Sequence, residues 1–124
     1  MKKYYRRAIS FSLLSVLLLG LVFMLTGCGL FGQKPTAEIS TDPPLTDGKV
    51  TANVGDDIVF SGENSEDPDG TITSYDWEFG DGQTASGEVQ THSYTSADTY
   101  TVTLTVTDDS GKPGNDSVEA EISS

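Results

Sequence analysis

The chain has 124 residues, of which 35% are apolar, and it carries 7 basic and 19 acidic side chains. This length leaves room for one small domain. Four of the basic residues lie within the first seven positions, so residues 28–124 hold three basic against nineteen acidic side chains, a charge of −16. Such an acidic surface excludes nucleic acid as a partner, because nucleic acids attract positively charged proteins. The single cysteine excludes an intrachain disulfide.

The first third of the chain is typical of a secretory signal. Basic residues are followed by an apolar run from Ala8 to Leu25, for which we expect a signal helix. The next residues, Leu25-Thr26-Gly27-Cys28, resemble the lipobox of bacterial lipoproteins. The resemblance implies that Cys28 receives diacylglycerol and palmitate-type acyl chains and becomes the first residue after cleavage. The alternative is an uncleaved membrane helix with an incidental cysteine.

The lipobox resemblance divides the chain into three parts. We expect a signal peptide at 1–27, a lipidated cysteine with a short linker at 28–35, and one folded domain at 36–124, with no further domain. Two or three acyl chains hold a protein on its membrane stably. We therefore expect the protein in the cell envelope, on the outer face of the cytoplasmic membrane or in the outer membrane; Gly29, where an aspartate would signal inner-membrane retention, favours the outer membrane.

The remaining sequence shows the alternation of half-buried β-strands. Between Tyr100 and Thr107 apolar residues alternate with threonines, so one face of the strand packs in the core and the other faces solvent. Similar alternation occurs at Ala37–Ile39, 50–54, 58–60, 73–79 and 118–122, with Thr73 and Val54 expected to face the core. The side chains that we predict at the centre of the core are Trp77, Tyr75, Phe79, Tyr100, Val102 and Leu104.

Turn motifs separate these strands. Asp67-Pro68-Asp69-Gly70 has the residue order of a type I turn, in which the Asp67 carboxylate accepts a backbone N–H. Gly80-Asp81-Gly82 supplies positive φ for a tight hairpin. Short alternating strands between turns predict an all-β fold, an antiparallel sandwich of about seven strands.

Several ordered motifs resemble the PKD (polycystic kidney disease) domain family. They are Ser65-Glu66-Asp67-Pro68-Asp69-Gly70, Trp77-Glu78-Phe79-Gly80-Asp81-Gly82, Thr91-His92-Ser93-Tyr94 and the strand Tyr100–Asp108. The resemblance spans about Pro35 to Ser123 and implies an immunoglobulin-like sandwich without catalytic residues, found on cell surfaces and in secreted hydrolases. The sequence departs from the family where a glycine usually precedes the Tyr-x-Val strand. Asp98 and Thr99 stand there, so we expect an altered local turn.

The turn Asp67-Pro68-Asp69-Gly70 is a candidate calcium site. Some similar domains of collagenases bind calcium near this loop, so the resemblance allows a site that involves Asp67 and Asp69. An EF-hand interpretation fails in three places: Ser65 stands at ligand position one, Pro68 stands at position four, and no helix flanks the loop. We favour the alternative that these carboxylates only cap a turn, with no cofactor required.

Two function classes remain. The favoured one is a noncatalytic surface module for adhesion, envelope architecture or binding of an extracellular protein. The alternative is a lipoprotein that binds polysaccharide or a calcium-dependent ligand through residues 65–70 and 80–87. An enzyme is disfavoured because His92 is the only histidine and adjacent strand residues such as His92 and Ser93 point to opposite faces.

Overall fold

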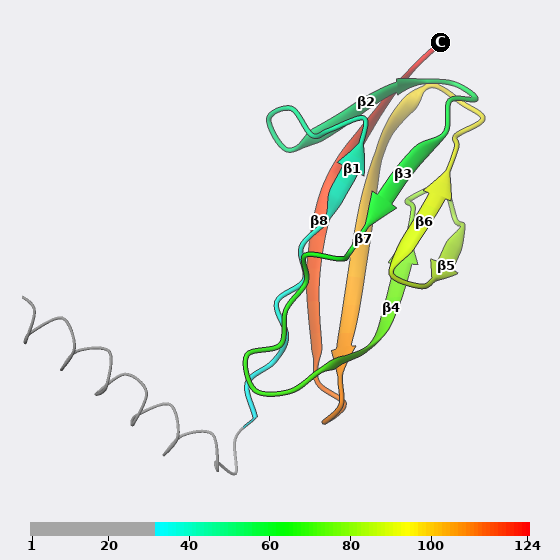
Figure 1. Cartoon of the computed structure of the whole chain (residues 1–124). Helices are drawn as coiled ribbons and strands as arrows, with labels where there is room; N and C mark the ends of the chain where they lie inside the picture. The colour runs from blue at the N-terminus through cyan, green and yellow to red at the C-terminus, as the bar shows by residue number, and fades with distance from the viewer. Residues whose placement is uncertain (1–31) are drawn as a thin grey trace, which may run out of the picture. The chain divides into compact units, whose positions relative to one another are not determined.

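The computed structural model describes residues 32–124, and these form a sandwich of two β-sheets (Figure 1). One sheet contains three strands in the order β1-β3-β6: β1 (Ser40–Asp42), β3 (Ile58–Ser61) and β6 (Val89–His92). The other contains five in the order β2-β8-β7-β4-β5: β2 (Lys49–Asn53), β4 (Ile72–Glu78), β5 (Thr84–Ser86), β7 (Asp98–Asp108) and β8 (Pro113–Ser123). The predicted all-β sandwich is confirmed, with eight strands among the described residues rather than about seven.

The longest pairing joins β7 and β8, which run antiparallel from Asp98 opposite Ile122 to Thr107 opposite Pro113. β2 pairs with β8 in parallel, whereas the sequence predicted only antiparallel neighbours. The chain leaves β2, forms strands of both sheets and only then returns as β8, which gives a parallel pair the long crossover it requires. Side-chain alternation is the same in both strand directions, so the sequence pattern does not reveal this pairing.

The core lies between the sheets and follows the alternation of β7. Val102, Leu104 and Val106 have no exposed surface, while the threonines between them are only half-buried. A cluster of rings, called here the aromatic cluster, fills the space beside them. Its members are Phe60, Trp77, Phe79, His92, Tyr94 and Tyr100.

The start of β4 departs from the predicted alternation. The sequence predicted that Thr73 faces the core, but the pairing register shifts between Ile72 and Ser74. Ile72 packs against the core, and Thr73 is exposed with its hydroxyl donating to the Thr107 carbonyl at 3.1 Å. The prediction was wrong because a bulge adds one residue to a strand and so changes which residues face inward.

Two residues at strand ends, Val54 and Asp98, concern expectations from the sequence, and only the expectation for Val54 was wrong. Val54 was expected to face the core, but β2 ends at Asn53 and Val54 is 39% exposed. Asp98, at a position where glycine is usual in the family, does not have a positive φ. Among the described residues, Asp47 is the one non-glycine residue with a positive φ. Instead, the Asp98 carboxylate accepts the Thr99 N–H at 2.8 Å at the start of β7.

The two ends of the sandwich carry different groups. At one end the turn at 67–70 meets the β7–β8 turn, where Asp109 N donates to Thr71 O at 2.9 Å. At the other end Gly55 N donates to Tyr94 O at 2.9 Å and Val54 N to Ser123 O at 2.8 Å. Figure 1 shows the described chain entering at the first end, in cyan, and terminating beyond the second.

The signal helix predicted from the sequence lies outside the described residues. So do Cys28, the cleavage site and residues 29–31 of the expected linker, and these interpretations stay predictions. Within residues 32–124, no helix has the length and apolar character needed to cross a bilayer. The compact unit of the described part begins at Gln33, inside the segment that we expected to be linker.

Candidate functional site

The acidic turn, Asp67 to Gly70, connects the region after β3 to β4. Asp69 N donates to Asp67 Oδ1 at 3.2 Å, the carboxylate-capped turn that its residue order favours. Asp69 Oδ2 in turn accepts the Gln33 N–H at 2.7 Å. Both carboxylates therefore serve backbone donors, Asp67 within the turn and Asp69 across to the N-terminal segment.

Asp109, from the β7–β8 turn, packs on the acidic turn. Its Oδ1 accepts the Thr71 N–H at 3.5 Å. A Cβ placed on Gly70 would collide with Asp109 Oδ1 and would lie 2.7 Å from Asp67 Oδ2. Two carboxylate oxygens from distant parts of the chain thus converge on the one residue that has no side chain.

The second oxygen of Asp67 is the unusual feature of this region. Asp67 Oδ2 is buried and has no hydrogen-bond partner, alone in this among the side-chain atoms of the described residues. Burial, together with the nearby charges of Asp69 and Asp108, raises the pKa of Asp67 above its ordinary value despite the N–H that it accepts from Asp69. An oxygen in this state favours a proton or a cation.

Asp108, next to Asp109, is a structural residue. It is 3% exposed, and its Oδ1 accepts bonds from Ser110 N at 2.9 Å, Ser110 Oγ at 2.8 Å and Lys112 N at 2.8 Å. Burial alone would raise the pKa of Asp108, but these donors outweigh it and hold the pKa below the ordinary value. This carboxylate fixes the β7–β8 turn and, through it, the position of Asp109.

The described residues contain no group of three or more His, Cys, Asp or Glu side chains arranged to hold a metal ion. Asp76 would be the ligand at position twelve of an EF-hand loop that starts at Ser65. It lies on the outer face of β4, where its Oδ1 accepts a bond from Ser86 Oγ at 3.1 Å. The acidic turn offers a cation one unpartnered oxygen, Asp67 Oδ2, with Asp109 Oδ1 close to it.

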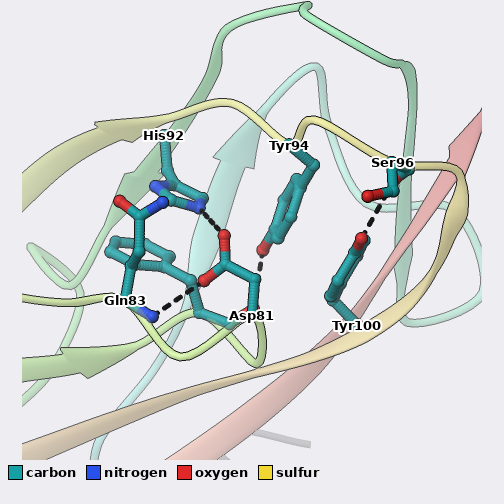
Figure 2. Close-up of polar contacts among 7 residues, drawn as sticks. Asp81, Gln83, His92, Tyr94, Ser96 and Tyr100 are labelled. Carbon is teal, nitrogen blue, oxygen red and sulfur yellow. Dashed lines mark hydrogen bonds and ion pairs between the residues drawn. The ribbon is translucent and has the colours of Figure 1, made fainter.

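A second polar group, the Asp81–His92 pair, links the two sheets (Figure 2). His92 on β6 places Nε2 2.9 Å from Oδ2 of Asp81, which lies in the β4–β5 turn; the side chains are 9% and 16% exposed. Gln83 N donates to the other oxygen of Asp81 at 3.0 Å. Burial alone would raise the pKa of Asp81, but the bonds from Gln83 and His92 lower it below the ordinary value.

The His92 ring is packed on several sides. Phe79 stacks on it with ring centroids 4.0 Å apart, and Tyr94 meets it edge-on at 4.7 Å. The Tyr94 hydroxyl donates to Phe79 O at 2.9 Å, and burial, reinforced by the charge of Asp81, raises the pKa of Tyr94. Figure 2 also shows Tyr100 donating to Ser96 O, at 3.0 Å. This is the packing of a structural histidine rather than of a general base.

The predicted core residues lie between the sheets to different degrees. Those buried are Trp77, Phe79, Val102 and Leu104, with at most 2% exposed surface. Trp77 Nε1 donates to Gly87 O at 2.8 Å, so its polar atom is satisfied. Tyr75 and Tyr100 are partly buried against this core, and the hydroxyl of Tyr75 donates to Glu88.

Sequence reasoning missed two residues that shape these sites, Asp109 and Asp81. Asp109 carries no signal of its own in the sequence, because its contact with Gly70 depends on the pairing of β4 with β7. Asp81 was assigned to a glycine-rich hairpin turn. The single histidine is the signal that could have found Asp81, because a buried imidazole needs a polar partner.

Taken together, the two sheets, the turns and the ring cluster define a small immunoglobulin-like β-sandwich module. Residues 33–123 match the family model described as the PKD domain. Because the match covers nearly all of the described residues, the chain belongs to the PKD domain family, as the sequence motifs indicated.

Three similar proteins show where such modules occur. The microbial collagenase of Vibrio alginolyticus is 50% identical over 66 residues, which are 50% of this chain and 8% of that protein. The PKD1 domain of the Vibrio cholerae metalloprotease PrtV is 33% identical, with a TM-score of 0.62, and is covered completely by 74% of this chain. A structure solved for carbohydrate-binding modules of the β-sandwich superfamily is 31% identical, with a TM-score of 0.69, over 76% of this chain and 36% of that one. The chain thus spans under a tenth of the curated collagenase.

Proposed function

We propose that this protein is a noncatalytic, lipid-anchored lipoprotein of the cell envelope, whose PKD module binds another extracellular protein. The observation that carries the noncatalytic role is the state of His92. The only imidazole of the chain is 9% exposed, stacked on Phe79 and bonded through Nε2 to Asp81, so it is committed to holding the two sheets together. The relatives support a location outside the cell, because collagen, the substrate named by a collagenase, is an extracellular protein.

The anchor is supported by Leu25-Thr26-Gly27-Cys28 and by the short distance along the chain from Cys28 to the compact unit at Gln33. Labelling of cells with radioactive fatty acid tests it. We expect label on the native chain and none on Cys28→Ala. The matched control carries Cys28→Ala together with Ser96→Cys, which keeps one exposed thiol but moves it out of the motif. Label on that control, or on Cys28→Ala, contradicts the anchor.

The charge of the module indicates the chemistry of its partner. Residues 28–124 carry nineteen acidic and three basic side chains, so a basic protein surface is complementary and its association should weaken as salt increases. Cross-linking on intact cells, at two salt concentrations and with Cys28→Ala as the unanchored control, identifies this partner. A dominant cross-link to an acidic protein, insensitive to salt, contradicts the proposal.

A second candidate function is ligand binding that depends on calcium, with polysaccharide as one ligand class. The observation in its favour is the unpartnered, buried Asp67 Oδ2 beside Asp109 and Asp69. The similar structure solved for carbohydrate-binding modules adds support for sugars. Calorimetric titration with calcium tests it against Asp67→Asn, which keeps the turn acceptor but removes the charge. A stoichiometric heat that Asp67→Asn abolishes favours this function, and no heat favours the simple turn.

A further inference from the structure

The segment from Gln33 to Ile39, called here the strap, is fastened along the sandwich. Every second residue of it, Pro35, Ala37 and Ile39, is buried. Its polar contacts are made to the chain around the acidic turn and to β8. They are Gln33 N to Asp69 Oδ2 (2.7 Å), Thr36 N to Glu66 O (2.7 Å), Glu66 N to Thr36 O (2.9 Å), Glu38 N to Ser65 Oγ (3.0 Å) and Ile39 N to Asp116 Oδ2 (3.0 Å).

The strap is part of the fold rather than a loose tether. Gly114 on β8 admits the Pro35 carbonyl, because a Cβ at Gly114 would collide with that oxygen. A segment that buries alternate side chains and pairs its N–H groups does not detach without exposing both. The tether toward the N-terminus therefore begins at Gln33, beside Asp69, and not at the first strand.

This exit point is at the end of the sandwich that carries the acidic turn. β8 runs away from that end through 11 residues, at about 3.3 Å each, so the far end with Tyr94 and Ser96 lies about 35 Å away. Between Cys28 and Gln33 the chain extends at most about 18 Å. That reach is about half of the length of the sandwich.

We propose that the strap orients the module on its membrane, with the acidic turn facing the lipid headgroups and the end that carries Tyr94 and Ser96 facing outward. This inference rests on the proposed acylation of Cys28. Residues 28–124 carry nineteen acidic and three basic side chains, so headgroup phosphates repel the sides of the sandwich within a Debye length of about 8 Å, and the module stands off the lipid instead of lying flat. The outward end is then the surface that a soluble partner meets first.

Energy transfer to a labelled membrane tests this orientation. The full chain is extracted from cells and reconstituted into phosphatidylethanolamine and phosphatidylglycerol vesicles that contain an acceptor lipid. A donor dye is attached to Pro68→Cys in the acidic turn or to Ser96→Cys at the far end; both positions are exposed. We expect several-fold more transfer from Pro68→Cys. Equal transfer, or more from Ser96→Cys, overturns the orientation.

The parent chain separates failure of the anchor from failure of the orientation. With Cys28 acylated, the parent protein takes up no thiol dye and floats with the vesicles. Dye uptake by the parent, or loss from the vesicles, overturns the anchor and the orientation together. If the parent protein takes up no dye and floats with the vesicles, equal transfer or more transfer from Ser96→Cys overturns the orientation alone. If Pro68→Cys fails to fold, Ser110→Cys in the neighbouring β7–β8 turn gives the same comparison.

Loosening the strap tests its role directly. The double variant Thr36→Pro with Asp69→Ala removes the N–H of Thr36 and the carboxylate that accepts the N–H of Gln33. The control, Thr36→Ser with Asp57→Ala, removes the same charge and leaves the strap bonded. We expect the difference in transfer between the two dye positions to shrink several-fold in the loosened protein and to persist in the control. An undiminished difference in a loosened protein that still melts cooperatively shows that the strap does not set the orientation.

Discussion

Two aspartates of this module, Asp81 and Asp67, occupy similar turns and have opposite environments. Both oxygens of Asp81 have partners, Gln83 N and His92 Nε2, and its pKa is lowered. Asp67 has one partnered oxygen and one buried oxygen without a partner, and its pKa is raised. A buried carboxylate therefore stabilises the fold only where hydrogen-bond donors are buried with it.

We expect the largest effect in the aromatic cluster, against which the Asp81–His92 pair packs. Trp77→Ala removes a side chain that is 1% exposed and the bond from Nε1 to Gly87 O, so we expect a loss of about 3–5 kcal/mol in the free energy of unfolding. Urea denaturation measures it. Glu78→Ala, exposed on the same strand, should change stability by less than about 0.5 kcal/mol. Equal effects of the two variants would refute this account of the core.

Asp81→Ala removes both bonds of the partnered carboxylate and leaves His92 Nε2 without its acceptor. We expect a loss of about 2–3 kcal/mol at pH 7, as for hydrogen bonds to charged groups. Asp57→Ala, at an exposed position, is the control. Stability equal to that control would mean that the inter-sheet pair contributes nothing.

The pH dependence of this loss has a definite sign. A carboxylate with a lowered folded-state pKa stabilises the fold above its unfolded pKa of about 3.9, and this stabilisation disappears as the pH falls through the lowered value. The gap between the native chain and Asp81→Ala should therefore close in acid. Unfolding curves from pH 7 to pH 2 measure it, and a gap that widens in acid contradicts the assignment.

Tyr94→Phe removes the buried hydroxyl that donates to Phe79 O, so that carbonyl loses this donor. We expect a loss of about 1 kcal/mol. Tyr100→Phe is the matched control in the same cluster, because the Tyr100 hydroxyl bonds Ser96 O at a less buried position, and its effect should be smaller. Thermal unfolding ranks the two variants, and the reverse order argues against burial as the cause.

Asp67→Asn should have the smallest effect and the opposite sign. Because burial and the neighbouring charges raise the pKa of Asp67, its charged form destabilises the fold at pH 7, and a neutral amide should increase the melting temperature slightly. As the pH falls through the raised value toward about 3.9, both side chains become neutral and the gain fades. Melting in chelator measures it. A lower melting temperature at pH 7 would show that the charge is compensated.

The fold was largely predictable because strand alternation is local. The alternation of apolar residues and threonines from Tyr100 to Thr107 assigns each of these residues of β7 to a face without knowledge of any neighbouring strand. Thr73 was assigned wrongly because the bulge beside it arises from the register between β4 and β7. The parallel pairing of β2 was missed for the same reason, since it joins residues far apart in the chain.

The acidic charge, the alternating strands, the carboxylate-capped turn and membership in the PKD domain family follow from residue types at short spacing and are therefore recognisable in the sequence. Which carboxylates have hydrogen-bond partners depends instead on the three-dimensional fold. It brought His92 to Asp81, set Asp109 against Gly70, and fastened Gln33 beside Asp69. These contacts depend on how strands from different parts of the chain pair, and a turn motif contains no information about what packs on it.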